Sequence, residues 1–252
     1  MRKWNFKIVL AGDGAVGKTS IRERYMGRGF ETSYLKTIGA DFASKKIQTD
    51  EDNIAFQIWD LAGQDSYQVV RSTFYKGATA AILVFDCQDP ATMTNLTSWL
   101  EEAIEGSNNG ILVYFIIANK VDLEDKRRVS REMALEFCNR LEAETGIHFY
   151  YSETSALTGQ NIQETFDLLA YRLLEANNIQ NFQLPKEVEG IIDIHKQKDG
   201  IVIAEKKEET TTVSNTIQEE IDKINNRIDI IEERLNTIQN IIKKIVQKIQ
   251  EE

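Results

Sequence analysis

A lysine and a threonine at the end of a glycine-rich stretch are the first residues in this sequence whose types and spacing could do chemistry. The stretch is GDGAVGKTS at positions 12–20, and the apolar run 6–11 precedes it. Its glycines allow a loop tight enough to point backbone N–H groups at phosphate oxygens. Lys18 would bring a positive charge to the β- and γ-phosphate oxygens, and Thr19 would offer a hydroxyl to Mg²⁺. The pattern predicts a nucleotide phosphate site bounded by Gly12, Asp13, Gly14, Ala15, Val16, Gly17, Lys18, Thr19 and Ser20.

A second polar segment indicates the base. Asn119-Lys120-Val121-Asp122 follows the apolar run 111–118, at the carboxyl end of an expected central strand, where open α/β sheets bind ligands. The Asp122 carboxylate can accept hydrogen bonds from a ring N–H and an exocyclic amine, a pair that guanine presents and adenine does not. Such a site can discriminate between bases by about 10⁴–10⁵. Ser155-Ala156-Leu157 can bring a backbone N–H to the guanine carbonyl oxygen. The two segments predict a guanine nucleotide, and Asp122 argues against an ATPase.

These segments need a sheet to position them, and up to about residue 177 expected strands alternate with expected helices. Runs 78–86 and 111–118 are almost continuously apolar, as central parallel strands covered on both faces are. We therefore expect an α/β fold with a mostly parallel six-stranded sheet and helices on both faces. Strands are expected at 6–11, 41–49, 53–59, 78–86, 111–118 and 147–153, and helices at 18–27, 66–75, 92–105, 130–144 and 161–176. Ser130 and Asn161 are expected to cap the last two helices.

The charge balance and the apolar runs disfavour other classes of protein. The chain has 30 Lys and Arg against 40 Asp and Glu, a net charge of −10, which argues against nucleic-acid binding and against an anionic membrane surface. No apolar run approaches the roughly 18 residues that cross a bilayer. Cys87 and Cys138 lie in apolar surroundings and are expected to be reduced core thiols, as in a cytoplasmic protein. His148 and His195 have no ligand-spaced partner, and we assign them no chemistry.

Five motifs together resemble those of the Ras superfamily of small GTPases. In chain order they are GDGAVGKT (12–19), Thr37 in YLKTIGADF (34–42), WDLAGQD (59–65), NKVD (119–122) and ETSAL (153–157). The resemblance covers the chain to about residue 177 and implies a P-loop NTPase G domain over residues 1–177. TIGADF and the run 72–78 are most similar to the sequences of Rab members, whereas GDGAVGKT is more similar to the corresponding motif of Rho members. Because no Rho-type insertion is evident after Asp122, a Rab-like protein is favoured.

The resemblance implies that the chain binds GTP and GDP with Mg²⁺. Thr37 and Asp60 would join Thr19 in holding the metal ion, Asp60 through water. Thr37 and Gly63 would each donate a backbone N–H to the γ-phosphate. Phe30 would stack edge-on against the guanine, and Tyr34 would close over the phosphates.

The resemblance also implies that the chain hydrolyses GTP and changes shape afterwards. Gln64 would orient the attacking water, and segments 31–42 and 62–75 would be switch loops that the γ-phosphate orders. The expected catalytic residues are Gln64, Lys18, Gly63 and Thr37. Nothing in the sequence marks an arginine that could act in cis, so intrinsic turnover should be slow. A partner that supplies one could add about 10³–10⁵ in rate, a magnitude general to this superfamily.

Effectors, exchange factors and GTPase-activating proteins are the partners that the resemblance implies. The competing hypothesis, from a different class, is a structural assembly protein that holds GTP without useful turnover. The presence of Thr37, Asp60, Gly63 and Gln64 favours the switch.

Beyond residue 177 the composition changes. Residues 178–215 are expected to be a linker with a β-hairpin at 191–204. From there a heptad pattern predicts a coiled-coil helix over 216–250. Its a and d positions are Ile217, Ile221, Ile224, Ile228, Ile231, Leu235, Ile238, Ile242, Ile245 and Ile249. Isoleucine at both positions favours trimers or tetramers over dimers.

Three binding partners for this heptad seam remain open. They are other copies of the chain (with a trimer favoured), a helix of a different protein, and the chain's own G domain. The seam runs from 217 to 249, about 50 Å of helix, which weakens the third alternative. Residues 179–252 hold 11 Lys and Arg against 15 Asp and Glu, a net of −4, and the sequence ends without a cysteine. We therefore expect neither a prenyl anchor nor a polybasic one.

Overall fold

The computed structural model describes residues 2–29, 37–48, 52–179 and 184–196. Strands alternate with helices through most of this part of the chain, as the sequence predicts, but the one helix expected at 92–105 is divided into Pro90–Thr94 and Leu96–Ser107. The strands are β1 (Arg2–Ala11), β2 (Ala40–Gln48), β3 (Asp52–Leu61), β4 (Ala80–Asp86), β5 (Val113–Asn119), β6 (Phe149–Thr154) and β7 (Ile191–Asp193). The helices are α1 (Lys18–Tyr25), α2 (Gln68–Tyr75), α3 (Pro90–Thr94), α4 (Leu96–Ser107), α5 (Arg131–Thr145) and α6 (Ile162–Ala176).

The strands form one sheet in the order β2-β3-β1-β4-β5-β6-β7. The five strands from β3 to β6 in this order are parallel, whereas β2 and β7 are antiparallel to their neighbours. The expected α/β fold is confirmed, but the expected count of six strands is wrong. The seventh strand arises because Ile191–Asp193 pairs with Ser152–Tyr150, so the chain returns after α6 to the free edge of β6.

The return strand β7 is held by side chains as well as by the sheet. His148 Nε2 and Asp193 Oδ1 are 2.7 Å apart, and Ile194 just after the strand is fully buried. His148 therefore has a structural contact. Residues 194–196 are helical, and the rest of the expected hairpin, with Lys198-Asp199-Gly200, lies outside the described residues.

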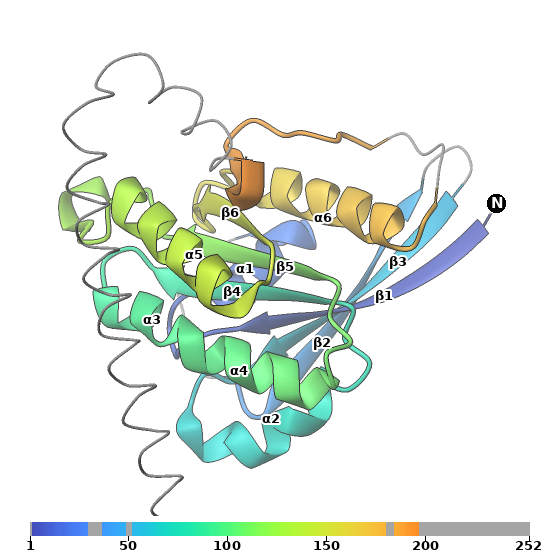
Figure 1. Cartoon of the computed structure of the whole chain (residues 1–252), viewed down its shortest axis with the longest axis horizontal. Coiled ribbons are helices and arrows are strands. Elements are labelled where there is room, and N and C mark those ends of the chain that lie inside the picture. The colour runs from blue at the N-terminus through green and yellow to red at the C-terminus, as the bar shows by residue number, and fades with distance from the viewer. Residues whose placement is uncertain (1, 30–36, 49–51, 180–183, 197–252) are drawn as a thin grey trace, which may run out of the picture. The chain divides into compact units, whose positions relative to one another are not determined.

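Two hydrophobic cores lie on opposite faces of the sheet. Helices α1 and α6 cover one face, and α2, α3, α4 and α5 cover the other (Figure 1). Strand β4 shows why both are needed, because Ile82 and Val84 face the first core while Leu83 and Phe85 face the second. This confirms the expectation of strands buried on both faces.

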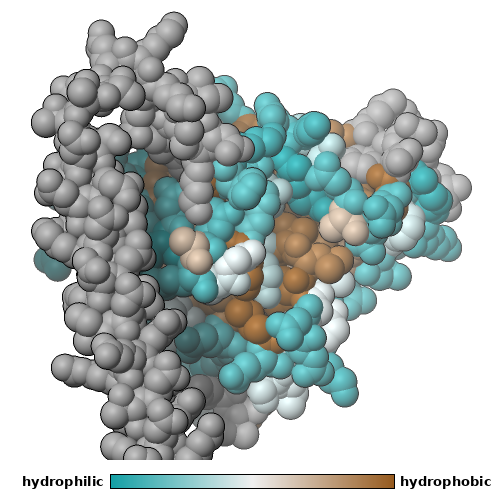
Figure 2. Space-filling model, in the orientation of Figure 1, coloured by the Kyte–Doolittle hydropathy of each residue, from teal (hydrophilic) through white to brown (hydrophobic). Residues whose placement is uncertain are grey.

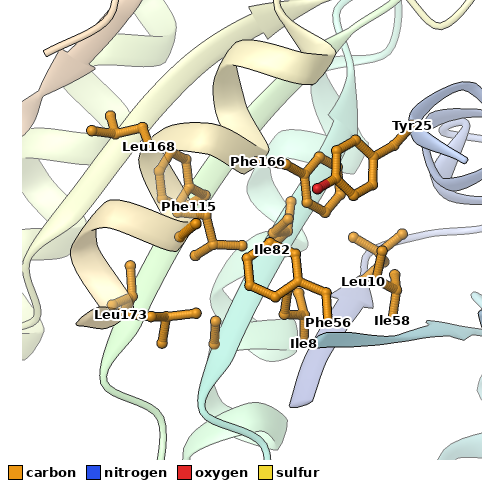
Figure 3. Close-up of a cluster of buried hydrophobic side chains, with 14 of the residues drawn as sticks. Ile8, Leu10, Tyr25, Phe56, Ile58, Ile82, Phe115, Phe166, Leu168 and Leu173 are labelled. Carbon is orange, nitrogen blue, oxygen red and sulfur yellow. The ribbon is translucent and has the colours of Figure 1, made fainter. Parts of the chain in front are cut away.

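The core under α1 and α6 centres on stacked aromatic rings. Tyr25 of α1 and Phe166 of α6 lie face to face, with ring centroids 3.8 Å apart (Figure 3). In the core on the other face, Cys138 is buried and free, and the second cysteine, Cys87, is likewise buried and free. Both are therefore thiols, as expected.

The two expected helix caps have different outcomes. Ser130 Oγ accepts a hydrogen bond from the Met133 backbone N–H at 3.3 Å, which confirms the cap of α5. The cap at Asn161 is wrong, because its side chain makes no capping bond and its φ is 55°. The Asn161 amide instead donates to the Glu153 carbonyl oxygen at 2.8 Å, a contact that ties α6 to the end of β6.

The face shown in Figure 2 is mainly hydrophilic, and its hydrophobic side chains gather in one area between α4, α5 and α6. None of the helices in the described part of the chain combines the length and apolarity that a bilayer crossing requires. The carboxyl ends of β1, β3, β5 and β6 meet at a single edge of the sheet because these strands are parallel. The loops that follow them carry the predicted chemistry, so the fold brings that chemistry together.

Candidate functional site

A cavity of about 920 Å³ opens at this edge of the sheet. It is lined by many of the residues that the sequence singled out, although they come from five separate segments of the chain. These residues are Gly14, Ala15, Gly17, Lys18, Thr19, Ser20, Thr37, Gly63, Gln64, Asn119, Lys120, Asp122, Ala156 and Leu157.

The remaining expected residues lie behind the cavity wall or outside the described residues. Val16, Asp60 and Ser155 are almost completely buried, and Asp60 and Ser155 each contact a residue that lines the cavity. Gly12 and Asp13 do not line the wall, but their carbonyl oxygens hold Lys18. Phe30 and Tyr34 fall outside the described residues.

The loop between β1 and α1 holds its lysine in a tightly defined place. Lys18 Nζ donates to the carbonyl oxygens of Gly12 at 2.6 Å and Asp13 at 2.7 Å. Burial lowers the pKa of Lys18 to about 8, because an ammonium group away from water is less stable. Gly17 must be glycine, since its φ is 100° and a Cβ there would lie 2.2 Å from Asn119 Nδ2.

Three side-chain oxygens from three segments converge beside Lys18. Thr19 Oγ1 donates to Asp60 Oδ2 at 2.5 Å and lies 3.1 Å from Thr37 Oγ1, which is 3.4 Å from the same Asp60 oxygen. Asp60 is fully buried, and its Oδ1 has no hydrogen-bond partner within the described residues. Burial raises the pKa of Asp60, because no full complement of partners replaces water. A carboxylate and two hydroxyls form a donor set that fits Mg²⁺, which prefers oxygen ligands.

The loops after β5 and β6 hold the predicted base-selecting carboxylate. Asp122 Oδ1 accepts a hydrogen bond from Ser155 Oγ at 2.5 Å, and Ser155 Oγ in turn accepts from the Thr158 backbone N–H at 3.1 Å. The fully buried Ser155 thus orients Asp122 at the cavity wall.

Asn119 joins the phosphate loop to the base-side loops. Its Nδ2 donates to the Val16 carbonyl oxygen at 2.8 Å. Its Oδ1 accepts from Thr154 Oγ1 at 3.1 Å and from the Ala156 backbone N–H at 3.3 Å. Lys120, with φ of 67°, donates from Nζ to Asp86 Oδ2 at 2.7 Å. The phosphate loop and the loops after β5 and β6 are therefore joined by hydrogen bonds through Asn119.

Comparison with known proteins agrees with this geometry. The sequence model that describes the Ras family matches residues 7–175, more than half of the chain. The chain belongs to the Ras family.

Several curated relatives of this Ras family member are Rab-type proteins. The Ypt/Rab-type GTPase ypt7 of Schizosaccharomyces pombe is 38% identical over 178 residues, which cover 69% of this chain and 84% of the relative. The Ras-related protein RABG3f of Arabidopsis thaliana is 35% identical, covering 75% and 91%. The Ras-related protein Rab-7a of Dictyostelium discoideum is 31% identical, covering 79% and 97%. The Rab-like assignment is confirmed, and the chain is a small GTPase that switches between GTP and GDP and hydrolyses GTP.

In this Ras family member the Asp13 side chain is turned to the helix layer of the sheet, where it contacts Trp99 and Asn95. Its Oδ1 accepts from Trp99 Nε1 and its Oδ2 from Asn95 Nδ2, both at 2.7 Å. Both carboxylate oxygens are thus bound to the segment that begins α4, and only the Asp13 backbone carbonyl faces Lys18. Sequence spacing could not indicate this, because more than 80 residues separate the partners.

Motif reading also missed charged residues that line the cavity of this small GTPase. Arg22 of α1 is buried, and its Nη2 lies 2.6 Å from both Glu23 Oε1 and Asp41 Oδ2. Arg28 pairs with the other Glu23 oxygen at 2.8 Å. Arg22 therefore ties α1 to the start of β2, four residues after Thr37, and no motif could have signalled this contact.

Proposed function

We propose that this small GTPase selects guanine through Asp122 and hydrolyses GTP slowly with the groups gathered around Lys18. A single observation carries the proposal: one cavity of about 920 Å³ is lined both by Asp122 and by Lys18, Thr19, Thr37, Gly63 and Gln64. A base-selecting carboxylate and a complete phosphate-side set in the same cavity suit one guanosine triphosphate.

Hydrolysis in this cavity is a matter of positioning and of charge stabilisation. Lys18 donates to the β- and γ-phosphate oxygens, the Gly63 N–H binds the γ-phosphate, and Gln64 orients the attacking water. Thr19, Thr37 and Asp60 would hold Mg²⁺, which when bound neutralises charge that develops on the phosphate oxygens.

The slow intrinsic rate follows from the arginines near the cavity. Of the described arginines that line it, Arg22 pairs with Asp41 and Glu23, and Arg28 pairs with Glu23. Both are engaged in ion pairs with this chain's own carboxylates. We propose that GTPase-activating proteins supply the stabilisation that the chain lacks, and that exchange factors open the cavity to release GDP.

Effectors have an apolar surface to bind beside the phosphate end of the cavity. Ile38, Phe42 and Val70 are 79%, 48% and 49% exposed. The Phe42 ring lies 5.1 Å from the Trp59 ring, which lies 5.4 Å from that of Phe74. Ile38 follows Thr37 directly, and Phe74 and Val70 lie on α2, which follows Gln64. We propose that effectors bind to this surface and so distinguish the GTP-bound from the GDP-bound protein.

Replacing Gln64 by leucine should slow single-turnover GTP hydrolysis by about 10- to 100-fold, because the attacking water loses its hydrogen-bonding partner. The affinity for a non-hydrolysable GTP analogue should change little. The rate is measured by phosphate release from purified protein loaded with GTP and Mg²⁺.

The matched control is Gln163→Leu, the same substitution at an exposed position of α6. It should hydrolyse GTP at the wild-type rate. Equal rates for Gln64→Leu and wild type would refute the role of Gln64. A wild-type protein that binds GTP but releases no phosphate would favour the alternative of a GTP-holding assembly protein.

We also propose that residues 216–250 form a coiled coil that joins three copies of the chain, or else binds a helix of a partner. The support is the unbroken heptad seam from Ile217 to Ile249, in which nine of ten core positions are isoleucine. Burying such side chains contributes about 1.5–3 kcal/mol each before entropy is counted.

Light scattering on the full chain tests the association. The wild type should have the mass of three chains, and Ile228→Asp should have the mass of one, because a carboxylate at an a position would be buried without a partner. Asn226→Asp, at an outward f position of the same helix, should remain trimeric. A monomeric wild type would exclude self-association, and the partner helix would then be the occupant to look for.

A further inference from the structure

Arg71 on α2 is almost completely buried, which is unusual for an arginine. Its Nη1 donates to the backbone carbonyl oxygens of Gln64 at 2.6 Å and Ala62 at 3.1 Å. Its Nε and Nη2 donate to the two carboxylate oxygens of Glu102 on α4, each at 2.8 Å. One guanidinium thus connects the loop that carries Gly63 and Gln64 to a helix on the sheet.

The same guanidinium stacks on a tryptophan that is itself fixed to the phosphate loop. The Arg71 Cζ lies 4.2 Å from the centroid of the Trp99 ring, and Trp99 Nε1 donates to Asp13 Oδ1 at 2.7 Å. Contacts therefore run without interruption from the Gln64 backbone, through Arg71 and Trp99, to Asp13.

The loop is held from its other side by the phosphate loop itself. A Cβ on Gly63 would lie 2.3 Å from the Asp13 carbonyl carbon and 2.4 Å from the Gly14 nitrogen. The 62–64 backbone is therefore confined between the phosphate loop and the Arg71 guanidinium. The motif residues take part in this confinement through their backbone atoms, and Asp13 also takes part through its side chain.

We infer that Arg71 is a positioning residue for GTP hydrolysis, which holds the 62–64 backbone so that the Gly63 N–H and the Gln64 side chain meet the terminal phosphoryl group and its attacking water. This inference rests on the proposed roles of Gly63 and Gln64. Arg71 itself touches neither GTP nor water in this role. It acts by reducing the conformations open to the loop, and Glu102 and Trp99 keep its planar group in place.

Arginine suits this task better than lysine. Its guanidinium presents five N–H donors in a rigid plane. Two of its nitrogen atoms can therefore bind one carboxylate while the third donates to two carbonyl oxygens. Its flat face can stack on Trp99 at the same time. A lysine ammonium group can reach some of these acceptors but cannot keep the bidentate pair with Glu102.

The test compares Arg71→Met with Arg140→Met in the full chain. Arg140 is a matched control because it also lies over an aromatic ring, that of Phe137, but its side chain is 64% exposed and lies on α5. Arg71→Met should slow single-turnover hydrolysis by about 10- to 100-fold, as a misplaced reacting group does. Its affinities for GDP and for a non-hydrolysable GTP analogue should stay within about threefold of wild type, and Arg140→Met should match wild type.

Hydrogen exchange provides a readout that does not depend on hydrolysis. With the GTP analogue bound, amides of residues 62–66 should exchange faster in Arg71→Met, while those of β5 should be unchanged. Arg71→Lys should fall between Arg71→Met and wild type in both measurements. In the Gln64→Leu background, Arg71→Met should add less than its separate effect, since the part of that effect that acts through the Gln64 side chain is already lost.

Three outcomes would overturn the inference: a wild-type hydrolysis rate in Arg71→Met, unchanged exchange at 62–66, or a full additional loss in the Gln64→Leu background. A parallel fall in melting temperature and nucleotide affinity, with hydrolysis of bound GTP unchanged, would show a purely structural residue. The proposed function fails separately, through a wild-type protein that hydrolyses no GTP.

Discussion

The variant Asp122→Asn should bind xanthosine nucleotides in preference to guanosine nucleotides. Asparagine keeps an oxygen that can accept from Ser155 Oγ, as Asp122 Oδ1 does at 2.5 Å, so the loop should keep its shape. The new amide group donates where the carboxylate accepted, and it therefore suits the second carbonyl of xanthine and not the amine of guanine. We expect the ratio of the two affinities to change by about 10⁴. Discrimination of this size arises when the wrong ligand leaves a polar group of the site without its hydrogen-bond partner.

Competition of GTP and XTP against a fluorescent GDP analogue measures this ratio. The matched control is Asp125→Asn, the same substitution at an exposed position three residues further on, which should keep the wild-type preference. An unchanged base preference in Asp122→Asn would remove the reason for assigning guanine, and with it the proposed function.

The variant Lys18→Met should lose nucleotide affinity by about 10²-fold or more, because two charge-assisted hydrogen bonds to phosphate are removed. Hydrolysis should fall below detection, since no other group replaces this charge next to the β- and γ-phosphate oxygens. The protein should still fold, because Lys18 is a costly buried ammonium whose pKa is lowered to about 8 by that burial. Methionine fills similar space without that cost.

Titration with a fluorescent GDP analogue measures the affinity, and circular dichroism shows whether the variant is folded. Lys126→Met is the control, because Lys126 is exposed in the turn after the base-side motif. It should bind like wild type. Near-normal affinity in a folded Lys18→Met protein would mean that the phosphates lie elsewhere.

Much of this architecture could be predicted because its signals are local. The continuous apolar runs at 78–86 and 111–118 indicated central strands, and those strands proved to be covered on both faces. Ser130 capped α5 as predicted, because a cap depends only on residues within one turn. The motifs follow parallel strands, so their convergence on one edge followed from the order of elements alone.

Other features depend on residues far apart in the chain, and no local pattern marks them. The residues that follow α6 carry no local signal that the chain later returns to pair Ile191–Asp193 with β6. Asn161 looked like a cap, but the end of β6 offered its amide a carbonyl oxygen at 2.8 Å. The Asp13 carboxylate accepts hydrogen bonds from Trp99 and Asn95, which lie more than 80 residues further along the chain.

The amino-acid sequence by itself determined the class of ligand, because guanine selection and phosphate binding need particular side chains at particular strand ends. Only the tertiary structure decided how those side chains are held in place. The Arg71 contact with Glu102 spans 31 residues, and that of Trp99 with Asp13 spans 86. Hydrogen bonds of this range depend on how the helices pack on the sheet, which is a property of the whole fold and not of any segment.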